Sequence, residues 1–269
     1  MTEIWLTGSY ALLLMLLMGL MTWFYSLQRN DVSIVDSLWS LMFLAAAILY
    51  AFSADTMNTR NLLLLVLVSA WAIRLSVFLT IRNWGQEEDR RYQEIRANNQ
   101  PNFHIKSLYL VFGLQAILAW VIAIPLLFAF SVPGQIGMLE IIATALWLIG
   151  FVFETSADQQ LYQFKSDPKN RGKVLNTGVW AYTRHPNYFG ECLIWWAYYL
   201  FALSVGAWWS VFSPLLMTLL LLRVSGVSLM EKDISERRAG YREYIETTNA
   251  FFPGIPHRAD ATLPRGSSK

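Results

Sequence analysis

The chain has 269 residues, of which 55% are hydrophobic and 15% are charged, and its formal net charge is +2 at pH 7. The hydrophobic share exceeds that of ordinary soluble proteins, so the composition excludes a soluble globular domain and predicts a membrane protein. The single cysteine, Cys192, excludes an intrachain disulfide and matches no metal-binding pattern. We expect membrane lipids and a lipophilic small molecule as partners, and no nucleic acid.

Apolar windows of roughly 20 residues, long enough to cross a hydrocarbon core of about 30 Å, recur along the chain. They lie at about 4–26, 33–53, 61–81, 107–130, 136–158, 188–206 and 208–229. The first window lacks the features of a cleaved signal peptide, so it is expected to be a retained span. Only "GAWWS" separates the last two windows, which favours a helical hairpin or one broken pair. The predicted fold is an all-α integral membrane protein, a bundle of about seven transmembrane helices.

The distribution of basic residues predicts the orientation of the chain. Setting aside Arg74 and Arg223, which lie within windows, alternate loops place 18 of the 21 lysines and arginines on one side and only Arg60 on the other. The basic side comprises the loops 82–106 and 159–187 and the segment from Lys232 onward. Because basic loops remain in the cytoplasm, we expect the amino terminus outside and the carboxyl terminus in the cytoplasm, in the inner membrane if the cell is bacterial.

The same pattern predicts one domain. The loops are too short to bury a core of their own, so residues 1–258 are expected to form a single transmembrane domain. Residues 259–269, which end in "LPRGSSK", are interpreted as a disordered tail or an expression remnant.

Ionisable residues at membrane depth cost roughly 2.5–3.5 kcal/mol each and are candidates for function. Any one of them could serve only to lock helices together, but their number favours a functional site. The set consists of Asp36, Arg74, Glu154, Asp158 and Arg223, with Glu191 nearer the interface.

Two polar stripes arise from helical spacing. Residues four, three and four apart lie on one helix face, which places Glu154, Asp158 and Lys165 on a common stripe. Asn187 and Glu191 form a second stripe, and Pro186 suits the first turn of their helix. The two stripes are expected to face Arg74 and Arg223.

The two basic loops suit anionic groups. Loop 82–106 has the dense mixture of charges of a solvated face, although Arg82, Arg91 and Arg96, with Tyr92, could clamp an anion. A phosphorylated cofactor or lipid headgroups would suit both loops equally well. No nucleotide-binding signature occurs, and the three histidines are too dispersed for a metal site. The basic residues of the second loop are Lys165, Lys169, Arg171, Lys173 and Arg184.

Several motifs occur in the order of a known family. "SIVDSLW", "RNWGQEEDRRY", "FETSADQQLYQFK", "NTGVWAYTRHPNYFGE", "LLLRVSG" and "YREYIETTNAFFP" extend over about residues 30–256. This ordered set resembles the bacterial branch of the steroid 5-alpha-reductase superfamily. The resemblance implies a seven-helix membrane fold and an NADPH-dependent oxidoreductase that reduces a carbon–carbon double bond conjugated to a ketone, as in a steroid enone.

The resemblance also implies cofactor-binding residues. The family's Asn, Asp and Arg correspond to Glu154, Asp158 and Lys165, so the first and third positions depart from the pattern. The additional charge of Glu154 and the loss of the bidentate guanidinium at Lys165 change the expected geometry. The remaining expected cofactor residues are Asn187, Glu191 and Arg223 at matching positions, together with Arg74, Arg171, Arg184, His185 and Tyr188. His185 is an equally good candidate for a helix cap.

The substrate end departs further from the family. Where the steroid reductases have Gln-Glu and a Tyr, this chain has Val35 and Asp36, and Trp71 lies three residues before Arg74. Hydride attack leaves negative charge on the carbonyl oxygen, so a donor there lowers the barrier. Either a protonated Asp36 is that donor, with help from Tyr92, or the substrate is not a 3-oxo steroid.

Two other functions remain open. The isoprenylcysteine carboxyl methyltransferases, which bind S-adenosylmethionine, share an "RHP-x-Y-x-G" stretch and a "Y-x-x-Y" ending. Glu231, Tyr241, Tyr244 and Pro253 fit that alternative. The earlier motifs fit the reductase better. A lipid-binding or scaffolding membrane protein without any cofactor is the third possibility.

Overall fold

The computed structural model describes residues 2–224 and 240–256. Every regular element within these residues is helical. Several features of the sequence analysis lie outside them, namely Glu231, most of the basic segment from Lys232, and the tail 259–269. The expected topology of those parts stays a prediction.

The chain separates into two compact units. Unit 1 comprises Met1–Trp147 and Trp195–Leu216, and unit 2 comprises Leu148–Ile194 and Met217–Lys269. Helices α8 (Met138–Ser166), α9 (Pro186–Leu203) and α10 (Phe212–Leu219) each contribute residues to both units. The expectation that residues 1–258 form a single transmembrane domain stays a prediction.

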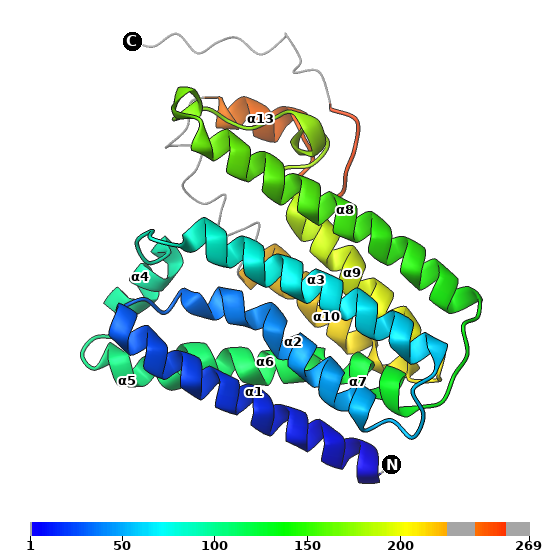
Figure 1. Ribbon diagram of the computed structural model, residues 1–269. Coiled ribbons are helices and arrows are strands. Elements are labelled where there is room, and N and C mark those ends of the chain that lie inside the picture. Colours follow the sequence, from blue (N-terminus) through cyan, green and yellow to red (C-terminus); the bar gives the residue numbers. More distant parts are fainter. Residues whose placement is uncertain (1, 225–239, 257–269) are drawn as a thin grey trace, which may run out of the picture. The chain divides into compact units, whose positions relative to one another are not determined.

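Unit 1 is built on three neighbouring helices, α1 (Thr2–Arg29), α2 (Ile34–Phe52) and α3 (Thr59–Asn83), which lie side by side in Figure 1. Asn58 caps α3 by accepting a hydrogen bond from the backbone N–H of Asn61. The short helix α4 (Arg90–Asn98) follows α3.

The fourth long helical segment of unit 1 is interrupted at its end. It consists of α5 (Phe103–Ser107), the π-helix η1 (Leu108–Gly113) and α6 (Leu114–Ile122), and a separate helix α7 (Ile124–Ser131) follows. Pro125 lies in the first turn of α7, where its missing N–H costs nothing, but it would remove a hydrogen bond from a continuous helix. The window predicted at 107–130 is therefore two helices rather than one.

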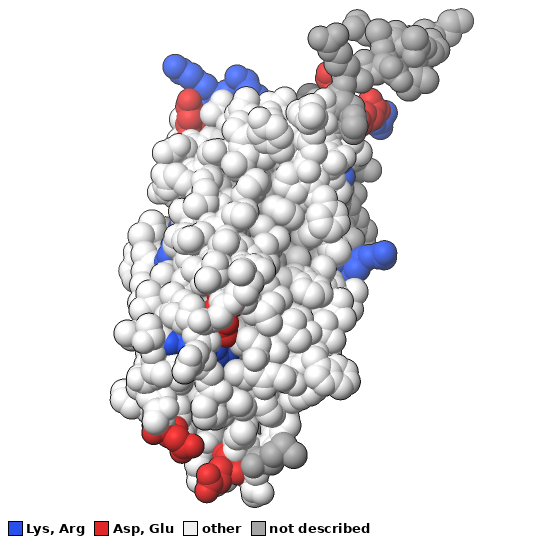
Figure 2. Space-filling view, turned by 90° about the vertical axis from the view of Figure 1, so that its right-hand side faces the viewer, with Lys and Arg blue, Asp and Glu red and all other residues white. Residues whose placement is uncertain are grey.

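The described residues contain five helices long and apolar enough to cross a membrane: α1, α2, α3, the segment Phe103–Ile122, and α8. The apolar segment Trp208–Arg223, which contains the 3-10 helix η4 (Trp208–Val211), α10 and the π-helix η5 (Leu220–Val224), is shorter. The face drawn in Figure 2 consists mostly of uncharged side chains. The protein is a helical membrane protein, as predicted; the number of seven spans stays a prediction.

A buried ion pair ties several helices of unit 1 together. Arg60 is completely buried, and its Nε lies 2.9 Å from Oε1 of Glu140 at the start of α8. The guanidinium also donates to the carbonyl oxygens of Ala129 in α7 and Phe201 in α9. These carbonyls lie in the last turns of their helices, where such groups lack partners within the helix. Arg60 and Glu140 therefore connect the ends of four helices.

Unit 2 contains parts of α8 and α9, the 3-10 helices η2 (Pro168–Asn170) and η3 (Gly178–Ala181), and α13 (Tyr241–Thr247). Gly178 has a φ of +61°, which favours glycine, and lies against the side chain of Gln160. The indole N–H of Trp180 donates to the carbonyl oxygen of Ala157, at 3.1 Å. The loop after α8 therefore folds back onto the same helix.

Candidate functional site

The first candidate site lies in unit 2, where the backbones of α8 and α9 touch. A Cβ atom on Gly150 would lie 2.6 Å from the carbonyl oxygen of Gly190, and one on Gly190 would lie 2.5 Å from that of Gly150. Both positions therefore require glycine. A Cβ on Gly190 would also lie 2.6 Å from the backbone nitrogen of Glu154. This close approach brings the polar residues of the two helices to short range.

Three carboxylates are buried on these helices. Glu154, Asp158 and Glu191 are 2%, 6% and 8% exposed. The side-chain amide of Asn187 donates to Asp158, with 3.4 Å between Nδ2 and Oδ1. The two segments are helical as predicted, because α8 continues through Glu154 and Asp158 and α9 begins at Pro186. Together these four side chains form what we call the α8–α9 polar cluster.

One polar atom of the α8–α9 polar cluster and one of the residue next to Glu154 lack a partner among the described residues. Asn187 Oδ1 and Thr155 Oγ1 are shielded from solvent, and neither has a hydrogen-bond partner among the residues that the structure describes. A shielded polar atom without a partner costs roughly 1–3 kcal/mol, so such atoms indicate a binding site for a ligand or water. The sequence did not predict Thr155 as a site residue; its position next to Glu154 was the only feature that could have indicated it.

The predicted loop residues of unit 2 divide into buried and exposed groups. Arg184 is buried, and its guanidinium donates to two carbonyl oxygens at the end of α13. One belongs to Ile245 in the last turn of the helix, and the other belongs to Thr248, which follows it. These contacts stabilise the carboxyl-terminal segment, and the expected position of Arg184 beside phosphates stays a prediction. Lys165, Arg171 and Arg223 are exposed.

His185 and Tyr188 lie at the start of α9. His185 is buried and immediately precedes the first residue of the helix, and its carbonyl oxygen accepts the N–H of Phe189 at 3.0 Å. The rings of His185 and Tyr188 stack with 5.7 Å between their centroids. This geometry agrees with the helix-cap interpretation of His185. The loop between α8 and α9 contacts the segment 240–256, because Thr183 Oγ1 donates to the carbonyl oxygen of Phe251 at 2.9 Å.

The expected catalytic residues lie in unit 1. Tyr92 Oη donates to Asp36 Oδ1 at 2.6 Å, and Arg91 Nη2 donates to Asp36 Oδ2 at 2.8 Å. Asp36 is thus an acceptor through both oxygens, which argues against the expected role as a proton-bearing donor. Arg91 is in turn held by Asp89, with 3.0 Å between Nε and Oδ1. We call Asp36, Asp89, Arg91 and Tyr92 the α4 charge network.

Electrostatics in the α4 charge network follow from burial and charge. Burial and the neighbouring charge of Asp36 raise the pKa of Tyr92 well above its ordinary value. Burial opposes ionisation of Asp89, but the hydrogen bonds and charge of Arg91 outweigh it and lower the pKa of Asp89 below its ordinary value. Tyr92 is therefore neutral and Asp89 is ionised at pH 7.

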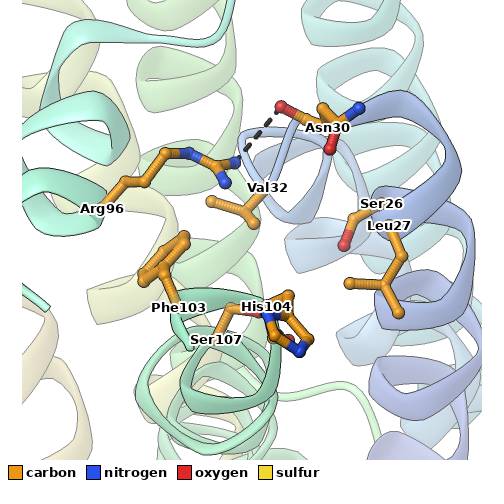
Figure 3. A pocket seen from close by; sticks show the side chains of 8 residues that line it. All are labelled: Ser26, Leu27, Asn30, Val32, Arg96, Phe103, His104 and Ser107. Atoms are coloured by element: carbon orange, nitrogen blue, oxygen red, sulfur yellow. Dashed lines mark hydrogen bonds between the residues drawn. The ribbon is translucent and has the colours of Figure 1, made fainter. Parts of the chain in front are cut away.

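Helix α4 is attached to the α1–α2 turn by a second charged contact. Arg96 donates to both oxygens of Glu88, at 2.8 and 2.7 Å, and Glu88 Oε1 accepts the N–H of Val32. Figure 3 shows Arg96 between Asn30, whose carbonyl oxygen it contacts at 3.2 Å, and the ring of Phe103. Two of the arginines predicted to clamp an external anion, Arg91 and Arg96, thus bind carboxylates of the same chain, whereas Arg82 donates to the amide oxygen of Asn83 at 3.0 Å.

The other two predicted residues of unit 1 each lie near an aromatic ring. Trp71 is completely buried in an aromatic core, with its ring edge-on to Trp195 at 5.6 Å. Its observed environment is that of a packing residue. The guanidinium of Arg74 lies 5.6 Å from the ring centroid of Phe78, one turn away. Within the described residues no group of three or more His, Cys, Asp or Glu side chains could hold a metal ion.

The fold and the buried polar residues define a multi-pass helical membrane protein with a cluster of buried polar side chains on two of its helices. The chain belongs to the family described as "Protein of unknown function (DUF1295)", which matches residues 22–248. This family is related to steroid 5-alpha-reductase-like proteins.

One curated relative is an uncharacterized protein of the fission yeast Schizosaccharomyces pombe. It is 27% identical over 277 residues, which cover 91% of this chain and 79% of the relative. No solved structure matches the chain significantly.

Proposed function

We propose that the protein is a membrane-embedded reductase that uses NADPH to reduce a carbon–carbon double bond conjugated to a ketone in a lipophilic, steroid-like substrate. The observation that carries this proposal is the α8–α9 polar cluster, which contains three buried carboxylates and the shielded amide oxygen of Asn187. The motif order of the bacterial reductases, which includes this cluster, supports it further.

The chemistry of unit 2 fits such a cofactor. Asn187 Oδ1 is a shielded acceptor that needs an N–H or O–H donor, and the shielded hydroxyl of Thr155 can either donate or accept a hydrogen bond. A nicotinamide ribose presents an amide and hydroxyl groups of this kind. Exposed Lys165 and Arg171 provide positive charge suited to phosphates. Since Lys165 lacks a guanidinium fork and Arg184 is engaged by residues 245–248, we propose that phosphate binding relies on charge more than on bidentate geometry.

The α4 charge network supplies the proposed catalytic groups. NADPH, when bound, would supply a hydride, and negative charge would then develop on the carbonyl oxygen of the substrate. A neutral phenol is a suitable donor to that oxygen, and Tyr92 is held neutral by burial and by Asp36. Its single hydroxyl proton is donated to Asp36 in the ligand-free protein, so we propose that the hydroxyl turns from Asp36 to the carbonyl oxygen when the substrate binds. Asp36 is a positioning residue in this proposal: it orients the hydroxyl of Tyr92, while Arg91 holds Asp36. Tyr92 thus substitutes for the phenol that is absent at Trp71.

Ligand binding to detergent-purified protein tests the proposed function. NADPH is expected to raise the melting temperature, because a ligand that binds only the folded state stabilises it by mass action. Asp158→Ala and Asn187→Ala should abolish the shift by removing the hydrogen-bonded pair. Asp167→Ala in the same unit, whose carboxylate is exposed, is the matched control and should retain the shift. Stabilisation by S-adenosylmethionine alone would replace the reductase with the methyltransferase.

The proposed catalytic role has a separate test. Tyr92→Phe should retain NADPH binding and lose at least about a hundredfold in the rate of enone reduction, since removal of one donor to a developing oxyanion has about this effect. A 3-oxo-Δ4 steroid and a shorter lipophilic enone are the first substrates to assay. A Tyr92→Phe protein with wild-type turnover would remove Tyr92 from the mechanism.

A further inference from the structure

A cleft in unit 1 lies at the ends of three membrane helices. It has a volume of about 150 Å³ and is formed by the last turns of α1 and α3, the first turn of α2 and the residues that follow α3. This volume exceeds the roughly 10–15 Å³ that a cavity needs to hold one water molecule. It is below the roughly 300–1,000 Å³ of pockets that enclose a drug-sized ligand. The cleft therefore suits a small polar group rather than a whole nucleotide or steroid.

The cleft carries one positive and one negative side chain that form no direct ion pair among the described residues, and the charge of Asp31 interacts with Arg96 only over a longer distance. Arg29 and Asp31 both line it, and neither forms an ion pair with any residue in the described part of the chain. The guanidinium of Arg29 lies 5.9 Å from the ring centroid of Trp84, and Asp31 Oδ1 accepts hydrogen bonds from the N–H and hydroxyl of Ser33. An occupant with a separated anion and cation matches these two charges.

The surface adjoining the cleft is apolar and exposed. Tyr25 and Thr80 line the cleft, and Met21 lies one turn before Tyr25 on the same face of α1, as Val77 does before Thr80 on α3. Met21 is 64% exposed and Val77 is 51% exposed. Exposed Trp84 and Tyr25 are of the aromatic type enriched where membrane meets water. Acyl chains can thus lie along α1 and α3 while a headgroup occupies the cleft.

We propose that this cleft binds the headgroup of a zwitterionic phospholipid. The phosphate lies against Arg29, the ammonium lies against Asp31 and the aromatic rings of Tyr25 and Trp84, and the acyl chains cover Met21 and Val77. The site is separate from the proposed NADPH-dependent reaction and does not depend on it. Binding involves no covalent step.

Native mass spectrometry of the delipidated full-length protein tests the proposal. Phosphatidylethanolamine, phosphatidylcholine and phosphatidylglycerol with the same acyl chains are the probes. Both zwitterionic lipids should bind at least tenfold more tightly than phosphatidylglycerol. Arg29→Gln should weaken binding of all three lipids about tenfold. Asp31→Asn, which retains an acceptor oxygen for Ser33, should abolish the preference over phosphatidylglycerol.

Two controls make the experiment decisive. Arg90→Gln and Glu94→Gln remove an exposed ion pair on α4, away from the cleft, and should leave binding and selectivity unchanged. Soluble phosphoethanolamine should bind at least tenfold more weakly than the lipid. Equal binding of phosphoethanolamine and lipid would contradict a contribution from the apolar face. Equal binding of phosphatidylglycerol by the wild-type protein, or selectivity that survives Asp31→Asn, would overturn the zwitterionic site.

Discussion

At the scale of single residues, buried charge has two distinct uses in this protein. Arg60 and Glu140 are almost completely inaccessible and bond to each other and to helix ends, so they serve the fold. Asn187 differs because one of its polar atoms is shielded without a partner among the described residues. Burial alone therefore does not identify a functional residue.

Glu140→Gln should destabilise the protein strongly. The substitution leaves the buried guanidinium of Arg60 without a countercharge, and breaking such a pair costs about 3–5 kcal/mol. Thermal unfolding in detergent measures the loss. The exposed pair of Arg90 and Glu94 provides the control, because Glu94→Gln should change stability by less than about 1 kcal/mol. Equal effects of the two substitutions would contradict a special role for the buried pair.

Asp89 should make folding stability depend on pH under acidic conditions. Its pKa is lowered in the folded state from an ordinary value near 3.8, so its contribution is fully present above that value and is lost as the pH falls through the folded pKa. Wild type and Asp89→Asn should therefore differ in melting temperature by a constant amount above about pH 4, and the difference should shrink below it. A difference in melting temperature that grows on acidification would contradict a lowered pKa of Asp89.

At the scale of elements, the crossing of α8 and α9 depends on the absence of two side chains. Gly150 and Gly190 place each helix backbone against the other. The contact of Asn187 with Asp158 follows from this crossing, since both residues lie within about two turns of the glycines. The geometry of the polar cluster is thus set by packing of apolar helix faces.

Gly190→Ala should separate α8 from α9 and weaken any ligand held by the polar cluster. The added methyl group would overlap the carbonyl oxygen of Gly150, and overpacking of this kind costs roughly 1–3 kcal/mol. Melting temperature and the NADPH-induced shift measure the two effects. Gly137→Ala is the control, because its Cβ would meet nothing nearer than 3.5 Å. A stable Gly190→Ala protein with unchanged ligand response would show that the crossing adapts.

Sequence periodicity predicted the stripes on α8 and α9, because spacings of three and four residues map directly onto a helix face. Contacts between different elements could be predicted less well from the sequence. Tyr92 and Asp36 are 56 residues apart, and nothing in the order of residues indicates that Arg91 bonds to Asp36 rather than to an external anion. The apolar window at 107–130 concealed a break, since Pro125 changes hydrogen bonding without changing hydrophobicity.

At the scale of the whole molecule, composition and the long apolar helices define a multi-pass membrane protein. The strong bias of lysine and arginine toward alternate loops supports the proposal of an external amino terminus and a cytoplasmic carboxyl terminus. Single cysteines introduced at Gln86 and Gln135 in a Cys192→Ser background should report this orientation. An impermeant thiol reagent applied to intact cells should label position 135 and not position 86; the reverse pattern would invert the proposed topology.

The ion pair of Arg60 and Glu140 has a consequence for synthesis of the chain. The two residues are 80 positions apart, and the Phe201 carbonyl that also accepts from Arg60 is 141 positions away. When α3 leaves the ribosome, Arg60 has none of these partners, and a lone charge is costly away from water. Arg60 must therefore remain hydrated at the membrane boundary until α8 and α9 have been inserted, so maturation of this end of unit 1 is a late, post-insertional event.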